Sequence, residues 1–88
     1  MPTYRVTLHR EAAKALPTLP DHIQAAVRAY ITDILQETPL TRIPQKTKKL
    51  KGRLEGIIQY DLPSGYRLWY RVDEAARVVY VDYIGPHP

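Results

Sequence analysis

The residues best suited to binding a charged ligand lie in one short segment, residues 38–54. This segment carries six basic side chains and no acidic one: Arg42, Lys46, Lys48, Lys49, Lys51 and Arg53. The residues before it are balanced in charge and those after it are slightly acidic, so the net charge of +4 originates here. Clustered lysine and arginine side chains neutralise phosphates and release bound counterions. The segment therefore predicts a polyanion site, with a solvated surface loop as the alternative.

Composition argues against several other kinds of site. The chain has no cysteine, and its three histidines, His9, His22 and His87, are widely separated, so we expect no disulfide, no metal site and no cofactor. No apolar run approaches the length of a membrane span, and the N-terminal residues lack a signal-peptide pattern. We therefore expect a cytoplasmic protein without membrane contact, and its 88 residues should form one domain, residues 1–88.

The elements that must position the basic segment are predicted from the spacing of apolar side chains. Alternation over residues 4–8 predicts a short strand. Residues 9–16 and then 21–38 predict a helical hairpin, with Asp21 as the N-cap of its second helix. Residues 56–62, 66–72 and 77–84 predict a meander of three strands, the last of them central in the sheet. The order predicts an α+β fold, with two helices on one face of an antiparallel sheet of about four strands.

Alternation within residues 66–72 assigns the two faces of that sheet. The apolar side chains should face the helices, and the polar ones should lie on the opposite face. The apolar set is Tyr66, Leu68, Tyr70 and Val72. The opposite set is Arg67, Trp69 and Arg71.

Two motifs carry a resemblance to a known family. Lys49-Leu50-Lys51-Gly52 precedes the second predicted strand, and Ser64-Gly65-Tyr66-Arg67-Leu68, followed by Tyr70, enters the third. Together with the preceding β-α-α segment, they make nearly the whole chain resemble the RelE/ParE superfamily of bacterial type II toxins, including its RelE and YoeB branches. The resemblance implies the RelE/ParE toxin fold. It also implies a cognate protein antitoxin as partner, in a toxin–antitoxin hetero-oligomer.

The same resemblance implies catalytic residues by position. The arginine of the Gly-Tyr-Arg-Leu segment is catalytic in RelE-like ribonucleases, and here it is Arg67. A second catalytic arginine of RelE corresponds to His87, near which YoeB-like members place a functional histidine. Two catalytic lysines of RelE correspond to Ile58 and Tyr60, so those cations are missing. The sequence ends at Pro88, before the positions of a catalytic tyrosine and a C-terminal helix in RelE.

RNA cleavage of this type needs a base for the 2′-hydroxyl, cations for the phosphate and an acid for the leaving oxygen. Arg67 is suited to binding the phosphate, because a guanidinium stays charged and matches two phosphate oxygens. The alternative is that Arg67 is a surface arginine paired with a strand neighbour such as Asp61. His87 could accept or donate a proton, because imidazole titrates near pH ~6.5; the alternative is a chain-end residue without function. Glu55 is a further possible proton acceptor, or a plain surface carboxylate.

The expected RNA contacts combine the basic segment with the face that carries Arg67. They are Lys46, Lys48, Lys49, Lys51, Arg53, Trp69 and Arg71. Trp69 could stack on an exposed base, or could belong to the core or to a surface that the antitoxin covers.

The sequence and the resemblance together predict a toxin that cleaves mRNA on the ribosome and so inhibits translation, with ribosome and mRNA as its targets. The alternatives are a ParE-like toxin that inhibits DNA gyrase and a catalytically degenerate toxin that binds only its antitoxin.

Overall fold

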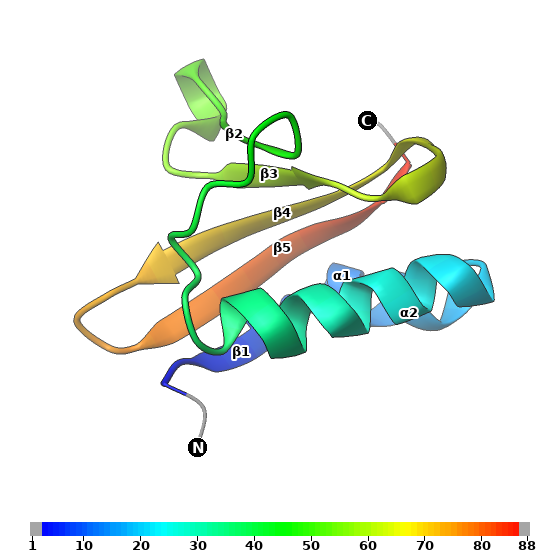
Figure 1. Ribbon diagram of the computed structural model, residues 1–88, viewed down its shortest axis with the longest axis horizontal. Coiled ribbons are helices and arrows are strands. Elements are labelled where there is room, and N and C mark those ends of the chain that lie inside the picture. The colour runs from blue at the N-terminus through cyan, green and yellow to red at the C-terminus, as the bar shows by residue number, and fades with distance from the viewer. Residues whose placement is uncertain (1–2, 87–88) are drawn as a thin grey trace.

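The computed structural model describes residues 3–86 as two layers, with helices on one face of a five-stranded sheet (Figure 1). The helical layer consists of α1 (Arg10–Ala15), a 3₁₀ turn (Leu16–Thr18), α2 (Asp21–Tyr30) and a π-helical turn (Ile31–Leu35). The sheet consists of β1 (Arg5–Leu8), β2 (Thr47–Lys49), β3 (Ile58–Asp61), β4 (Tyr66–Asp73) and β5 (Val78–Pro86). This confirms the predicted α+β fold.

The two helices begin differently. The N-cap of α1 is His9, whose Nδ1 accepts a hydrogen bond from the backbone N–H of Glu11. The N-cap of α2 is Pro20, so the prediction of an Asp21 cap is wrong. Asp21 is instead the first helical residue, where its carboxylate complements the positive end of the helix dipole. No helix in residues 3–86 is both long enough and apolar enough to cross a membrane.

The strand order is β1-β5-β4-β3-β2, and β3, β4 and β5 form the predicted antiparallel meander. β1 pairs with β5 in parallel, from Arg5 beside Val78 to Leu8 beside Val81, so the sheet is mixed and the expectation of a wholly antiparallel sheet is wrong. Alternation in one segment gives no information on the direction of a distant partner. β5 is interior, as predicted, and β4 is the middle strand.

The fifth strand, β2, lies within the basic segment and forms an edge of the sheet against β3. The sequence does not predict this strand, because lysine has a low strand propensity and the segment shows no apolar alternation. Lysine is nevertheless common on edge strands, where its charge prevents pairing with another chain.

The core lies between the helices and the sheet, and the predicted face of β4 is confirmed. Leu68 and Tyr70 are fully buried, together with Val27 of α2. The hydroxyl oxygens of Tyr30 and Tyr70 share a hydrogen bond at 2.8 Å. Burial raises the pKa of both hydroxyls, and for Tyr30 the bond to Tyr70 raises it further.

A β-bulge in β5 changes which side chains face the helices. Trp69 pairs with Tyr83 and Tyr70 with Val81, so no β4 residue lies opposite Asp82 in the strand register. Because of this extra residue, Val81 and Ile84 are both buried, although they are three positions apart. Tyr83 lies beside Trp69 on the face away from the helices.

Candidate functional site

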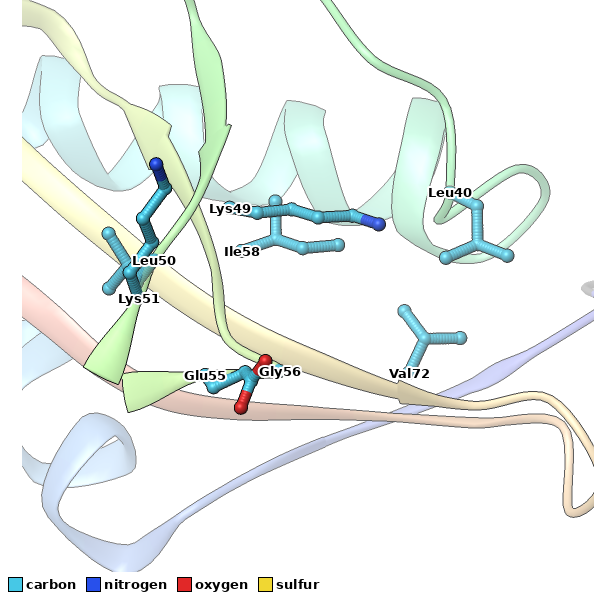
Figure 2. Close-up of a pocket in the computed structure, with 8 residues that line it drawn as sticks. All are labelled: Leu40, Lys49, Leu50, Lys51, Glu55, Gly56, Ile58 and Val72. Carbon is cyan, nitrogen blue, oxygen red and sulfur yellow. The ribbon is translucent and has the colours of Figure 1, made fainter. Parts of the chain in front are cut away.

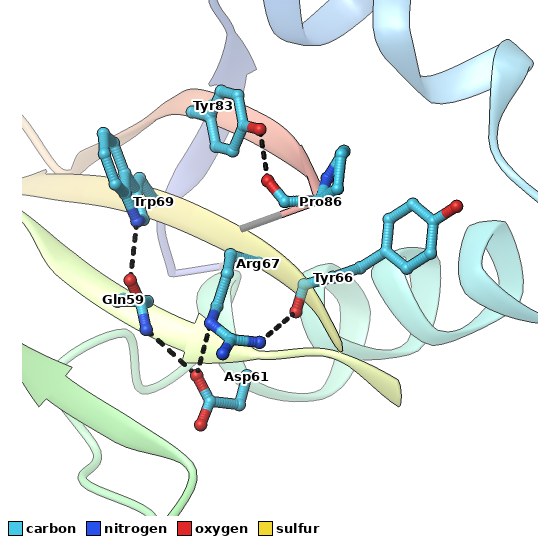
Figure 3. Close-up of polar contacts among 7 residues, drawn as sticks. All are labelled: Gln59, Asp61, Tyr66, Arg67, Trp69, Tyr83 and Pro86. Atoms are coloured by element: carbon cyan, nitrogen blue, oxygen red, sulfur yellow. Dashed lines mark hydrogen bonds and ion pairs between the residues drawn. The ribbon is translucent and has the colours of Figure 1, made fainter. Parts of the chain in front are cut away.

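The face of the sheet that the helices leave uncovered, called here the open face, carries two neighbouring rows of polar and aromatic residues (Figure 3). The strand register places Gln59, Trp69 and Tyr83 side by side across β3, β4 and β5. A second row lies two residues away from the first on each strand. It consists of Asp61, Arg67 and Gly85.

Arg67 lies along this face with 21% of its side chain exposed. Its Nη1 donates a hydrogen bond to the Tyr66 carbonyl at 3.2 Å, and its Nε is 3.4 Å from Asp61 Oδ1. The contact of Nε with Asp61 is an ion pair and not a hydrogen bond. The buried Nε atom has no hydrogen-bond partner within the described residues. The pairing with Asp61 considered in the sequence analysis is therefore present, but in a weak geometry.

Gln59 connects the two rows and is only 5% exposed. Its Oε1 accepts a hydrogen bond from Trp69 Nε1 at 2.9 Å, and its Nε2 donates one to Asp61 Oδ1 at 3.1 Å (Figure 3). This chain of bonds fixes the orientation of the Asp61 carboxylate. Gln59 was not among the predicted site residues, although it alternates in phase with Asp61 on β3, which was the available signal.

Trp69 is half-buried on the open face, and its ring centroid is 5.2 Å from that of Tyr83. It is absent from the buried core, which excludes a core role for it. The Tyr83 hydroxyl donates a hydrogen bond to the Pro86 carbonyl. A Cβ atom at position 85 would lie 2.8 Å from the Tyr83 hydroxyl oxygen, so Gly85 gives Tyr83 room to fold along its own strand.

Arg71 is held firmly at the bulge. Its Nε and Nη2 donate hydrogen bonds to the two carboxylate oxygens of Asp82, at 2.7 and 3.2 Å. These bonds raise the pKa of the guanidinium. Its central carbon also lies 5.1 Å from the centre of the Tyr80 ring.

The basic segment is divided between two faces by β2. Lys48 pairs with Gln59 and belongs to the open face, whereas Lys49 pairs with Ile58 and belongs to the opposite face. Lys49 and Lys51 line a cavity of about 480 Å³ over an apolar floor that includes Ile58 (Figure 2).

The remaining predicted residues of this region lie in a second cavity, in a turn and beside the first cavity. Lys46 and Lys48 line a small cavity of about 130 Å³ together with Asp61. Arg53 is exposed in a 3₁₀ turn, Gly52–Leu54. Glu55 lines the cavity of Figure 2, on the side of Lys49 and Lys51 and not beside Arg67.

His87 lies outside the described residues, so its predicted position beside Arg67 stays a prediction. The register supports it only as far as Gly85, which pairs with Arg67. Ile58 and Tyr60, which correspond to the lysines of RelE, face the helices: Ile58 is buried, and the Tyr60 ring stacks on Tyr30 with centroids 3.7 Å apart. Among residues 3–86 no group of three or more histidine and carboxylate side chains could hold a metal ion.

Comparison with protein-family models finds no match, and comparison with curated proteins finds none either. Several solved structures are similar. One is a chain of the toxin–antitoxin complex RelBE2 from Mycobacterium tuberculosis, with 29% identity, a TM-score of 0.77 and coverage of 99% of this chain and 100% of that one. Another is a mutant of the toxin RelE from E. coli in complex with a peptide of its antitoxin, with 26% identity, a TM-score of 0.76 and coverage of 98% and 85%.

A third similar structure is a YoeB/ParE toxin from Agrobacterium tumefaciens. It has 15% identity and a TM-score of 0.81, and the match covers 96% of this chain and 99% of that one. At this identity the likeness concerns the fold alone.

Proposed function

We propose that this chain, whose fold and sequence resemble those of RelE/ParE-superfamily toxins, cleaves mRNA on the ribosome as the toxin of a type II toxin–antitoxin system. The observation that carries the proposal is the position of Arg67. Its guanidinium lies on an open sheet face, paired only weakly with Asp61 and next to a half-buried tryptophan.

In this proposal the open face binds the mRNA. Arg67 holds the phosphate at the cleaved bond, and its positive charge stabilises the negative charge that develops there. Trp69 stacks on a base next to that bond, while Lys48 and Arg71 contact flanking phosphates. His87, which lies outside the described residues, supplies or accepts a proton.

The cations on the opposite side of β2 then contact a different polyanion. Lys49 belongs to the opposite face and lines a cavity with Lys51, and we assign these two side chains and the exposed Arg53 to ribosomal RNA. Lys46, immediately before β2, completes the cationic edge. This division lets the protein bind the ribosome with one surface and act on mRNA with another.

We further propose a cognate antitoxin as the regulatory partner. The RelBE2 and RelE structures are complexes of a toxin with an antitoxin. An acidic stretch of the antitoxin would bind the same cations that bind RNA, and would form a hetero-oligomer with the toxin. The ribosome as target implies a cytoplasmic site of action.

Inhibition of DNA gyrase is the second candidate function. It is favoured by one observation: the positions that carry catalytic lysines in RelE are occupied by Ile58 and Tyr60, whose side chains pack toward the helices. A toxin without those cations has fewer groups for phosphate chemistry.

Induction of the protein in bacteria separates the two candidates. The endonuclease proposal predicts that translation stops and that new mRNA 5′ ends appear within codons of translated messages. Purified protein should cut mRNA when ribosomes are present and leave free mRNA intact. DNA-damage signalling before any loss of translation, with intact mRNA, would instead identify gyrase inhibition.

A further inference from the structure

Two aspartates of the open face pair with arginines, and the two pairs differ in a way that bears on chemistry. Asp82 uses both carboxylate oxygens to accept hydrogen bonds from Arg71. Asp61 uses only Oδ1, which accepts a hydrogen bond from Gln59 and lies 3.4 Å from Arg67 Nε. Within residues 3–86 no donor bonds to Oδ2 of Asp61, and 40% of the side chain is exposed. Asp61 therefore retains an oxygen that is open to a ligand.

The guanidinium of Arg67 is likewise only partly occupied. Its Nε faces Asp61, and its Nη1 is bonded to the Tyr66 carbonyl (Figure 3). Its Nη2 has no hydrogen-bond acceptor in the part of the chain that the structure describes. A phosphate bound at Nη2 and the Asp61 carboxylate at Nε would therefore contact the same planar guanidinium group. This places a carboxylate next to the phosphate, where the base for a neighbouring 2′-hydroxyl must be.

We propose that Asp61 is the proton acceptor for RNA cleavage, acting beside Arg67 on one phosphodiester; this rests on the proposed endonuclease function. The 2′-hydroxyl gives its proton to Asp61 Oδ2, and its oxygen forms a bond to phosphorus. The bond from phosphorus to the 5′-oxygen breaks, and that oxygen takes a proton from water. The products are a 2′,3′-cyclic phosphate and a 5′-hydroxyl. Arg67 stabilises the charge on the phosphate throughout.

Gln59 has a supporting role in this assignment as a positioning residue. It is nearly buried, and its amide is held between Trp69 Nε1 and Asp61 Oδ1. The bond from Gln59 occupies Oδ1 and leaves Oδ2 for the proton. A base stacked on Trp69 would thus contact the side chain that donates a hydrogen bond to Gln59, the residue that orients the acceptor.

Single-turnover cleavage of ribosome-bound mRNA by purified variants tests the assignment. Asp61→Asn should bind ribosomes normally but cleave roughly 100-fold or more slowly, the usual contribution of a general base. Asp61→Gly should be equally slow and should recover activity when formate is added, because formate supplies a carboxylate in the vacated space. Sodium chloride at the same ionic strength should not restore it. Glu74→Gln, in the exposed turn between β4 and β5, is the matched control and should cleave normally.

The other outcomes are equally informative. Unchanged or faster cleavage by Asp61→Asn would overturn the assignment, since it would make Asp61 a bystander or a counter-ion that competes with phosphate. Slow cleavage by Asp61→Gly that formate does not restore would show a purely structural role. If the unaltered protein does not cleave ribosome-bound mRNA at all, the proposed function fails and the assignment fails with it.

Discussion

Arg67 combines partial burial with incomplete pairing, and this combination distinguishes it from a structural arginine. A stabilising surface pair has short, aligned contacts, as Arg71 has with Asp82. Arg67 has a 3.4 Å ion pair and a buried Nε without a hydrogen-bond partner among the described residues. Its contribution to folding should be small and its contribution to ligand binding large.

Arg67→Ala should therefore abolish mRNA cleavage while lowering the free energy of unfolding by only ~1 kcal/mol or less, the scale of a partly exposed ion pair. Arg67→Lys should restore little, because an ammonium cannot match two phosphate oxygens at once. Thermal unfolding and single-turnover cleavage measure the two effects. Arg10→Ala, on exposed α1 surface, is the control. Full activity in the Arg67→Lys variant would contradict the bidentate role.

The buried hydroxyl pair of Tyr30 and Tyr70 supports a prediction about stability. Tyr70→Phe leaves the Tyr30 hydroxyl buried without its partner, which should cost about 1–3 kcal/mol of unfolding free energy. The double variant with phenylalanine at both positions should recover much of that loss, because no polar group is then left unpaired. Denaturant unfolding of the two single variants and the double variant measures the coupling. Additive losses would show that the bond contributes nothing.

The same pair predicts how stability depends on pH. Burial raises the pKa of both hydroxyls in the folded protein, so the folded state keeps these protons longer than the unfolded chain does. The stabilisation is complete below the unfolded pKa of about 10 and is lost as the pH rises above it. Denaturant unfolding between neutral and strongly alkaline pH should show this loss. The double phenylalanine variant should show a smaller one.

At the scale of elements, β2 determines how the basic segment is used. Its alternation places Lys48 with Gln59 and Lys49 with Ile58, on opposite faces of the sheet. A flexible loop would instead present all of its lysines to one ligand. The three residues of β2 thus convert a single cluster of charge into two surfaces.

Replacement of lysines on each surface should have different effects. Changing Lys49 and Lys51 to alanine should weaken ribosome binding and flatten its dependence on salt, because each lost phosphate contact lowers the slope. Cleavage by the bound protein should be unchanged. Lys48→Ala should instead slow cleavage at saturating ribosome. Lys14→Ala on α1 is the control for charge alone. If Lys48→Ala and the replacement of Lys49 and Lys51 changed ribosome binding and cleavage equally, this would argue against two separate binding surfaces.

Local patterns were sufficient to predict most of the fold. Helical spacing located α1 and α2, and alternation in β4 assigned Arg67 and Trp69 to the open face. The features that were missed depend on distant partners: the parallel direction of β1, the bulge at Asp82 and the pairing of β2 with β3. For the same reason, Arg67 and Trp69 were predicted as site residues, whereas Gln59 and the role of Asp61 were not. Gln59 and Asp61 gain their importance from the register between β3 and β4, which the sequence does not display.

At the scale of the whole molecule, the two cationic surfaces on either side of β2 predict how the protein is neutralised. A protein encoded beside this chain should have an acidic stretch that contacts at least one of these surfaces, and its co-expression should restore growth. Changing Lys48 and Lys49 to glutamate should weaken the complex, because like charges then face each other. Isothermal titration with the purified partner measures this. Antitoxin contacts confined to α1 and α2 would contradict it.

The parallel pairing of β1 with β5 has a consequence for how the protein is made. β1 comes near the start of the chain, yet its partner strand begins at Val78. Such a pairing closes a long loop and forms late. During translation, β1 has no partner until β5 has left the exit tunnel, and Arg67 on β4 lacks its neighbour Gly85 until the same moment. The pairing opposite Arg67 is therefore completed only after the segment that carries β5 has emerged, so the open face forms late in synthesis.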